Sequence, residues 1–256
     1  MGQIVVVINQ KGGVAKTFTT QSFAACLVRN GMNVLMVDLD YQCTLTHTTP
    51  VDRDGVNIWD VLNGVTSIKD AIVPLSEELF CSLVRGSEYM AQADARFNGN
   101  VDVLLTALES IRDDFDVILV DTPPGLGIVS LNALAASDQV VIPVTPDMPA
   151  VDGAYALGKT IAGLREMGYE IHIAGVLVTQ YNGRLSITRL MESVIDRMAD
   201  TLGTKRFKTP IRFSAAVAKE AQSYRSDILS WAPKSALAQD YMSFTEEFLE
   251  GVKDNG

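Results

Sequence analysis

Short apolar runs alternate with longer amphipathic stretches along the chain. The apolar runs are continuous in Val, Ile and Leu, as in Ile4–Ile8 and Val117–Val120, which is typical of strands buried on both faces of a parallel sheet. We predict strands near residues 3–8, 33–38, 79–84, 116–121, 139–144, 172–179 and 207–212. We predict helices near residues 16–30, 56–64, 100–112, 128–136, 151–166, 186–200, 214–223 and 236–252.

The regular alternation of strands and helices predicts an α/β fold, with a doubly wound, mostly parallel sheet flanked by helices. The chain has 256 residues, of which 47% are hydrophobic, enough for the core of one such fold. We therefore expect a single domain over residues 1–256, without a separate N-terminal helix-turn-helix domain. Residues 86–100, with their Gly, Ser, Asp and Asn content, are expected to be the least regular part.

The link between the first predicted strand and helix has the features of a phosphate-binding loop. Its glycines let backbone N–H groups turn toward anionic oxygens, and the helix adds the positive end of its dipole. Lys16 would reach the β- and γ-phosphates, and the Thr17 hydroxyl would bind Mg²⁺. The usual G-x-x-x-x-G-K-[ST] pattern has Gln10 and Ala15 here in place of its glycines. The predicted nucleotide-binding residues of this loop are Lys11, Gly12, Gly13, Val14, Ala15, Lys16, Thr17 and Phe18.

Two further predicted strands end in carboxylates. Asp38 and Asp40 follow one apolar run, and Asp121 follows another. Because ligands bind at the carboxyl ends of the strands in open α/β sheets, these acids are expected beside the loop. We predict that Thr17 and Asp121 hold Mg²⁺, with Asp121 usually acting through water, and that Asp38 supports either Mg²⁺ or the loop. Capping of a helix or a turn is the alternative role for Asp38 or Asp40.

The three motifs together resemble the deviant Walker A, A′ and B motifs of the ParA/MinD ATPases, which are P-loop NTPase-like proteins. They occupy residues 11–17, 38–40 and 121–125. Residues 140–144, 175–184 and 221–233 resemble the ParA branch in particular. The resemblance extends from about residue 3 to residue 250.

The resemblance implies an ATPase that uses ATP and Mg²⁺ and hydrolyses ATP slowly until a partner stimulates it. Lys11 matches the signature lysine, which crosses a dimer interface to the nucleotide of the partner. Lys16 and Lys11 would neutralise charge in the transition state, and Asp40 would orient the attacking water. The regions of Asn182 and Pro210 are expected to surround the adenine.

Ala15 departs from the family pattern, which usually has glycine before the loop lysine. If this position requires a positive φ, alanine costs roughly 1 kcal/mol or more, whereas a helical φ makes alanine harmless. Phe18 replaces a common threonine, and Tyr41 replaces a proline. These differences affect the expected turnover more than nucleotide binding, so an ATP-dependent DNA-binding module with weakened hydrolysis is one alternative function.

The charges are unevenly distributed. The net charge is −10, which by itself disfavours binding to DNA. Residues 184–234, however, contain ten Lys and Arg and five Asp and Glu, a net charge of +5, so the remainder carries −15. Such a region can contact DNA phosphates without reading the sequence, or it can be an ordinary solvated surface. Nonspecific DNA binding by ParA relatives favours the first interpretation, with candidate contacts at Arg184, Arg189, Lys219, Arg225 and Lys234.

These observations lead to the hypothesis of a partition ATPase that forms a homodimer with ATP, binds DNA nonspecifically and positions plasmid or chromosomal DNA or another large cargo. The implied partner is a ParB-like centromere-binding or adaptor protein. A MinD-like membrane-associated ATPase is one alternative, but the C-terminal segment 244–256 is acidic rather than basic. A metabolic ligase that shares the sheet is another.

Composition narrows the expected location. No apolar run approaches the ~18 residues of a membrane span, and the N-terminus lacks the basic segment of a signal peptide. Three unclustered cysteines, Cys26, Cys43 and Cys81, favour a reducing compartment over a disulfide framework or a cysteine metal site. We expect a cytoplasmic protein that associates with the nucleoid and not with membrane.

Overall fold

The computed structural model describes residues 2–75 and 80–254, and within them seven strands form one sheet. The strands are β1 Gln3–Val7, β2 Val34–Asp38, β3 Ile72–Pro74, β4 Cys81–Val84, β5 Val117–Asp121, β6 Gln139–Val144 and β7 His172–Val178. Their order is β3-β4-β2-β5-β1-β6-β7, and all neighbours are parallel except β3 and β4. The predicted α/β fold, doubly wound and mostly parallel, is confirmed.

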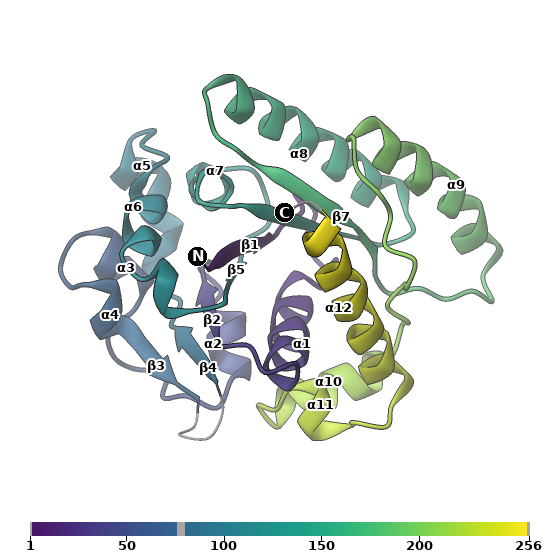
Figure 1. Cartoon of the computed structure of the whole chain (residues 1–256), viewed down its shortest axis with the longest axis horizontal. Coiled ribbons are helices and arrows are strands. Elements are labelled where there is room, and N and C mark those ends of the chain that lie inside the picture. Colours follow the sequence, from purple (N-terminus) through teal and green to yellow (C-terminus); the bar gives the residue numbers. More distant parts are fainter. Residues whose placement is uncertain (1, 76–79, 255–256) are drawn as a thin grey trace.

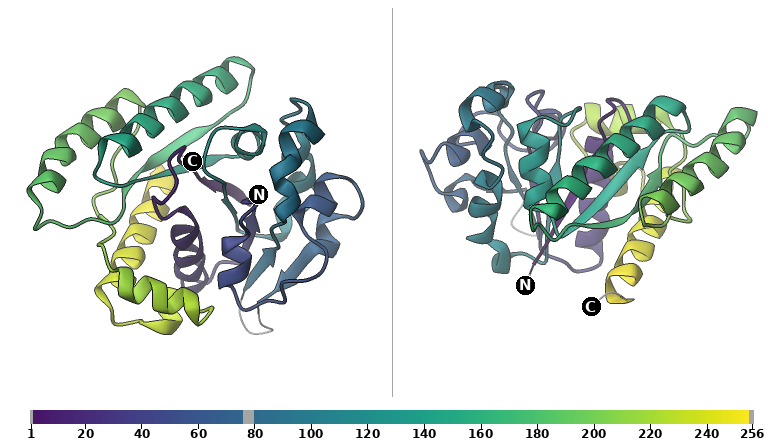
Figure 2. Two further views of the ribbon diagram at one scale, coloured as in Figure 1. Left: turned by 180° about the vertical axis from the view of Figure 1, so that it is seen from behind. Right: turned by 90° about the horizontal axis from the view of Figure 1, so that it is seen from above.

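Helices cover both faces of this sheet. The helices of the described residues are α1 Lys16–Arg29, α2 Thr44–Thr48, α3 Ile58–Leu62, α4 Ile68–Ala71, α5 Ala93–Phe97, α6 Val103–Glu109, α7 Ile128–Ala135, α8 Met148–Glu166, α9 Ser186–Thr201, α10 Ala215–Ser223, α11 Ile228–Trp231 and α12 Ala236–Asp254, with 3₁₀ helices η1 Glu88–Gln92 and η2 Arg112–Asp114. Figure 1 shows α8 and α9 on the side of β7 opposite to α1 and α12, and Figure 2 shows the same division from two other directions.

Neighbouring residues of one strand belong to different cores. On β1, Ile4 and Val6 pack in the core that includes α7, α8 and α9, whereas Val5 packs in the core that includes α1 and α12. All three side chains are fully buried. Because both faces of the strand are covered, its sequence is continuously apolar instead of alternating.

The predicted elements are confirmed with one exception. All eight predicted helices and six of the seven predicted strands are present, with boundaries that differ by at most three residues; residue 79, at the start of one predicted strand, lies outside the described residues. The predicted strand at 207–212 is wrong. This segment touches the edge of β7 through the isolated bridges of Val176 with Arg206 and of Tyr181 with Arg212. Pro210 lies between them and has no N–H group for a continuous ladder.

Several short elements were not predicted. The edge strand β3 has three residues, and residues 86–100, expected to be irregular, contain η1 and α5. The long parallel strands matter more for the site. The β2–β5 register pairs Asp38 with Asp121, so two predicted site residues stand next to each other where both strands end.

Candidate nucleotide-binding site

The loop between β1 and α1 adopts two left-handed backbone conformations, at Gly13 (φ 77) and Ala15 (φ 65). Ala15 is the residue before α1, with ψ 31, and no side chain caps the helix there. Position 15 therefore requires a positive φ, the conformation in which alanine is strained and glycine is not.

Lys16 turns back over its own loop. Its ammonium group donates to the carbonyl oxygens of Asn9 and Lys11, each at 3.3 Å. The side chain is 7% exposed, and burial lowers the pKa of Lys16 although Asp121 and Asp40 favour its charged form. The cation is thus held inside the loop, on carbonyls that a phosphate oxygen can replace.

Asp38 and Asp121 are fully buried but differ in their partners. The Asp38 carboxylate accepts the N–H of Asp40 at 3.2 Å and both the N–H and the hydroxyl of Thr46 at 2.8 and 2.7 Å. Burial raises the pKa of Asp38 to about 6 despite these bonds. Among residues 2–75 and 80–254, no group makes a hydrogen bond of normal geometry to either Asp121 oxygen, although the nearby Thr17 hydroxyl acts to lower the pKa of Asp121. Burial, followed by the charge of Asp38, raises the pKa of Asp121 well above its usual value.

The unpartnered oxygens of Asp121 fit a cation, because a buried carboxylate without donors needs a positive charge or a proton. Among residues 2–75 and 80–254, no group of three or more His, Cys, Asp or Glu residues is arranged to hold a metal ion. A cation here would take most of its ligands from Thr17, water and phosphate, as Mg²⁺ commonly does. The Asp38 carboxylate already accepts three hydrogen bonds. It is therefore better suited to hold the 40–46 segment in position than to bind a metal ion.

Asp40 lies at the entrance to α2. It is 6% exposed, and its carboxylate accepts the N–H of Gln42 at 2.9 Å, which fixes the turn after β2. Asp40, Gln42 and Thr44 line the same cavity as the phosphate loop. An acid at this place can orient a polar molecule beside the phosphates.

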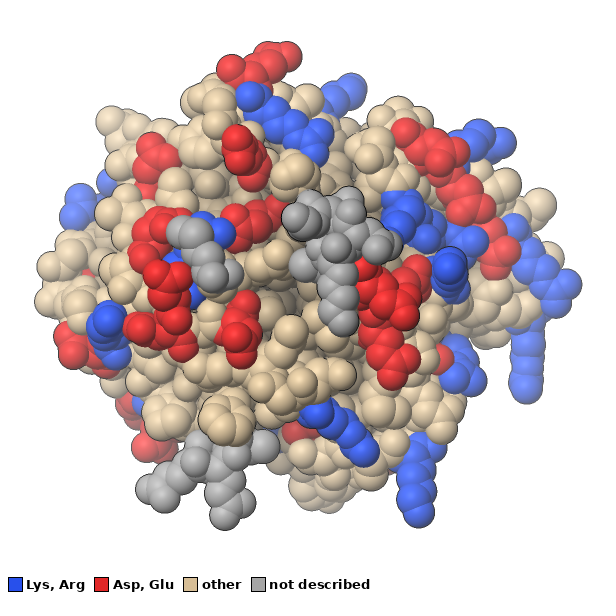
Figure 3. Space-filling model, viewed as in Figure 1, with Lys and Arg blue, Asp and Glu red and all other residues tan. Residues whose placement is uncertain are grey.

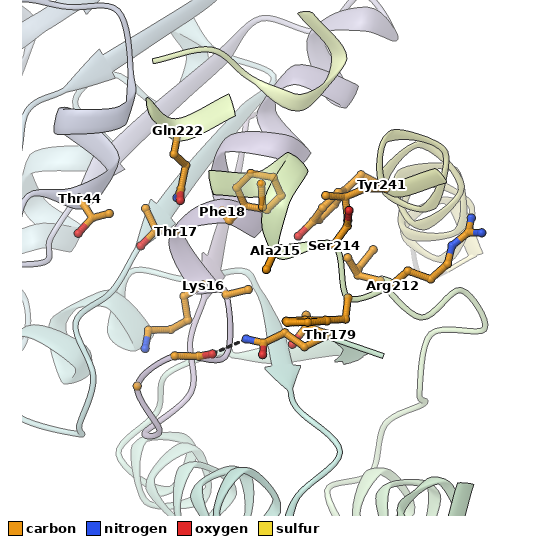
Figure 4. A pocket seen from close by; sticks show the side chains of 18 of the residues that line it. Lys16, Thr17, Phe18, Thr44, Thr179, Arg212, Ser214, Ala215, Gln222 and Tyr241 are labelled. Atoms are coloured by element: carbon orange, nitrogen blue, oxygen red, sulfur yellow. Dashed lines mark hydrogen bonds between the residues drawn. The ribbon is translucent and has the colours of Figure 1, made fainter. Parts of the chain in front are cut away.

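The cavity has a volume of about 360 Å³. Figure 4 shows Lys16 and Thr17 on one side of it and Ser214, Ala215 and Tyr241 on another. These side chains come from α1, from the start of α10 and from α12. Polar loop atoms at one end and apolar side chains at the other suit a nucleotide, with its charged phosphates and flat base.

The apolar end of the cavity has other lining residues than the two that the sequence analysis named. Asn182 and Pro210 do not line the cavity, whereas their neighbours Gln180, Ile211 and Phe213 do. The predicted segments therefore reach the cavity through these neighbours, and contact of either segment with adenine stays a prediction. Val14 does not line it either; this residue is buried beneath the loop.

Two residues that the sequence did not reveal fasten the phosphate loop to the end of β7. The Thr179 hydroxyl donates to the carbonyl oxygen of Val14 at 3.0 Å, and the Gln180 amide donates to that of Gly13 at 2.6 Å. Gln180 itself has a left-handed φ of 51. These bonds join residues more than 160 positions apart, so no local sequence signal could have indicated them.

Lys11 lies outside the cavity. Its ammonium group contacts both carboxylate oxygens of Asp147, at 2.9 and 2.8 Å, and the Thr145 hydroxyl at 3.3 Å. Asp147 also caps α8 by accepting the N–H of Ala150 at 3.0 Å. Partial burial would raise the pKa of Asp147, but the hydrogen bonds from Lys11 and Thr145 outweigh this and lower it. The sequence signal for the role of Asp147 is the Asp-Met-Pro start of α8, which is typical of a capped helix.

Comparison with known proteins agrees with this geometry. Residues 2–173 match a family described as "AAA domain". The sporulation initiation inhibitor protein Soj of Bacillus subtilis (strain 168) is 32% identical over 253 residues, which cover 96% of this chain and 98% of that protein. The chromosome-partitioning ATPase Soj of Thermus thermophilus is 33% identical over 252 residues, covering 98% of this chain and 96% of that protein. The chain belongs to the ParA/MinD superfamily of ATPases.

Solved structures of similar proteins include two that contain a bound nucleotide. A cobyrinic acid a,c-diamide synthase from Mycobacterium smegmatis, with bound ADP and magnesium, is 29% identical with a TM-score of 0.84, covering 100% of this chain and 97% of that one. A putative plasmid partition protein from Borrelia burgdorferi B31, bound to AMPPNP, shares the fold at 20% identity and a TM-score of 0.82, covering 98% and 99%. Nucleotide and magnesium are therefore bound by proteins built like this ParA/MinD-type chain.

Four of the five candidate DNA contacts of this ParA/MinD-type chain are exposed: Arg184, Arg189, Lys219 and Lys234. In Figure 3, Lys and Arg side chains are densest on the right-hand and lower right part of the face, over the region of α9 to α12. Arg225 is the exception, because one of its Nη atoms donates to the carbonyl oxygens of Thr49 and Val51 and its Nε is buried. The Arg225 guanidinium is thus engaged within the chain in this conformation.

None of the helices within the described residues is long and apolar enough to cross a membrane. The apolar face of α12 is also occupied. Tyr241, Phe244 and Phe248 are buried, and Phe23 of α1 packs against the last two with ring centroids 5.0 Å apart in each case.

Proposed function

We propose that this chain is a partition ATPase that dimerises when it binds ATP, binds DNA nonspecifically and positions plasmid or chromosomal DNA or another large cargo. The observation that carries the proposal is the separation of the two loop lysines. Lys16 lines the nucleotide cavity, whereas Lys11 is outside it, on the junction of β6 and α8. One cation is available to the chain's own nucleotide and the other to a second molecule. The names of the Soj relatives support the partition role.

The triphosphate would replace the carbonyl contacts of Lys16. Thr17 and Asp121 would hold Mg²⁺, since no donor of normal hydrogen-bond geometry satisfies the Asp121 oxygens within the described residues. Bound Mg²⁺ neutralises charge on the β- and γ-phosphates. Asp40 would orient the water that attacks the γ-phosphorus, and cleavage of the bond to the bridging oxygen would give ADP and phosphate.

Lys11 would leave Asp147 and contact the nucleotide of a second copy. A triphosphate carries more negative charge than one carboxylate, so the exchange is favourable only when ATP is bound opposite. A second cation in the transition state would also speed hydrolysis, as an arginine finger does. Pairing and turnover would thus depend on the same side chain.

DNA contact would use Arg184, Arg189, Lys219 and Lys234, which belong to the region of net charge +5. Two copies in a dimer would present this surface twice, and the second contact becomes intramolecular once the first is made. DNA affinity would then depend on ATP without any change in the surface itself. The protein would reside in the cytoplasm on the nucleoid, and a ParB-like or adaptor protein would stimulate hydrolysis and release it.

The test is DNA binding measured without nucleotide, with ADP, with ATP and with AMPPNP. We expect tight binding only with ATP and AMPPNP, and a steep loss of affinity as salt is raised. The Lys16→Ala variant is the control, because it should lose nucleotide binding and hence all nucleotide dependence. Equal DNA affinity in all four states would contradict the proposal.

A metabolic ligase is the second candidate, because one similar solved structure carries the name of a diamide synthase. Such an enzyme would hydrolyse ATP rapidly only in the presence of a small organic acid. ATP turnover measured with DNA, and separately with carboxylic acid substrates and an amide donor, would distinguish the two. A MinD-like membrane role is disfavoured by the buried apolar face of α12, and co-sedimentation with anionic vesicles and ATP would test it.

A further inference from the structure

Two aromatic rings stack on the surface where α10 is joined to α11. The rings of Tyr224 and Trp231 are 4.4 Å apart between centroids and 15° from parallel. Tyr224 is nonetheless 68% exposed and Trp231 37% exposed. Each ring covers one face of the other, so the pair still presents open aromatic surface to a partner.

The backbone holds this pair in place. Arg225, directly after Tyr224, has a left-handed φ of 53, and its guanidinium contacts with Thr49 and Val51 fasten that turn to the end of α2. Asp227 caps α11 through the N–H groups of Leu229 and Ser230 at 2.8 and 2.9 Å. Strained non-glycine residues that neighbours hold in position are typical of functional surfaces.

The lysines close to the pair in the sequence suit a polyanion. Lys219, on α10, and Lys234, shortly after α11, are both exposed. Of the acids in residues 219–234, Glu220 is exposed and Asp227 is engaged in its cap, and exposed Asp52 follows Val51, which Arg225 contacts. Aromatic rings beside lysines are the combination with which proteins hold nucleic acids, because rings pack on bases or sugars while cations neutralise phosphates.

We propose that Tyr224 and Trp231 form an aromatic contact with DNA, flanked by Lys219 and Lys234. This inference rests on the proposed function and adds a second kind of interaction to it. The lysines supply binding that falls with salt, whereas the rings supply binding that salt does not screen. The pair thus sets the affinity that remains at high ionic strength.

The experiment compares the DNA affinity of variants with AMPPNP over a series of salt concentrations, on duplex and on single strands. Tyr224→Ala and Trp231→Ala should each weaken binding by about five- to tenfold at every salt concentration, with the salt slope unchanged. Lys219→Ala and Lys234→Ala should each reduce the slope by about 1. Tyr89→Ala is the matched control, since Tyr89 is 61% exposed but lies on η1. Thermal unfolding and AMPPNP-dependent dimerisation of each variant confirm that it is folded.

Fluorescence gives a direct second measurement, because the chain has only two tryptophans, Trp59 and Trp231. The Trp59→Phe variant should show a change in Trp231 emission when DNA is added with AMPPNP. Unchanged emission together with unchanged affinity of the Tyr224→Ala and Trp231→Ala variants would overturn the aromatic contact alone. An emission change with a protein partner but not with DNA would overturn it in favour of protein docking. Failure of the unaltered chain to bind DNA in any nucleotide state would overturn the proposed function as well.

Discussion

Ala15 carries backbone strain at the point where the phosphate loop enters α1. Its φ of 65 and ψ of 31 place its Cβ in the conformation that costs an L-residue about 1–2 kcal/mol. The loop is fixed on its other side by Thr179 and Gln180, so it cannot relax without losing these bonds. The strain is therefore stored beside the phosphates.

We expect Ala15→Gly to stabilise the nucleotide-free protein by about 1 kcal/mol, because glycine adopts a positive φ without strain. In a chain of this size that corresponds to a rise of roughly 2–4 °C in Tm. Thermal unfolding measures it. The matched control is Ala25→Gly in the interior of α1, which should cost about 1 kcal/mol instead.

Equal destabilisation by both substitutions would show that the left-handed conformation at position 15 is not a source of strain.

Turnover of the Ala15→Gly variant tests the alternative of weakened hydrolysis. A large increase in the rate of ATP hydrolysis would favour that alternative, and an unchanged rate would show that Ala15 is compatible with the normal cycle.

At the scale of residues, the sequence predicted the chemical type of the site residues but not their backbone conformation or their contact partners. The loop sequence indicated Lys16 and Thr17, the end of an apolar run indicated Asp121, and the structure brings the three together. The φ of Ala15 and the engagement of Arg225 depend on contacts with residues far along the chain. A pattern of residue types contains no information on such contacts.

The N-terminus of α8 is the element that holds Lys11. Asp147 caps the helix, and Gly153 lies so close to the loop that a Cβ there would come within 2.7 Å of Asn9 Oδ1. Asn9 in turn donates to the carbonyl oxygens of Pro143 and Ala150 at 2.8 and 3.4 Å. The start of α8 and the phosphate loop are therefore packed as one unit, with Lys11 on its surface.

We expect Asp147→Asn to lower the ATP concentration needed for dimerisation by about two- to fivefold, because a partly exposed ion pair contributes about 0.2–1 kcal/mol. Asparagine still caps a helix, so α8 should remain intact while Lys11 is released. Light scattering during an ATP titration measures the shift. Asp152→Asn is the control, since it removes the same charge from an exposed position on α8. An unchanged or higher ATP requirement would show that Asp147 does not restrain Lys11.

Helices and strands with a clear hydrophobic pattern were predictable from the sequence. Short elements that form only through contacts with other parts of the chain were not. Continuous apolar runs gave β1, β5 and β6, and long amphipathic patterns gave α9 and α12. The segment 207–212 has strand-like composition, but Pro210 prevents a ladder along β7. Helices of four or five residues, such as α5 and α11, are too short to form without tertiary contacts.

At the scale of the whole molecule, charge and nucleotide chemistry are separated in space but connected through α10. Ala215, Ala218 and Gln222 of this helix line the nucleotide cavity, while Lys219 on the same helix is exposed. The DNA surface that we propose therefore begins on an element that forms part of the nucleotide site. One fold can link the nucleotide site to this surface because the parallel neighbours β1, β2 and β5 end on the same side of the sheet.

In a symmetric dimer of two chains, the two loop lysines would have different roles. Lys11 lies outside the nucleotide cavity and Lys16 lines it, so the two alanine variants should fail at different steps. Lys11→Ala should bind ATP with affinity close to that of the unaltered chain but should not dimerise, and its hydrolysis and ATP-dependent DNA binding should fall with dimerisation. Lys16→Ala should lose nucleotide binding itself. A fluorescent ATP analogue measures the first step and light scattering the second. Normal ATP-dependent dimerisation of Lys11→Ala would mean that no cation crosses between subunits, and the link between pairing and nucleotide would have to come from the 40–46 segment instead.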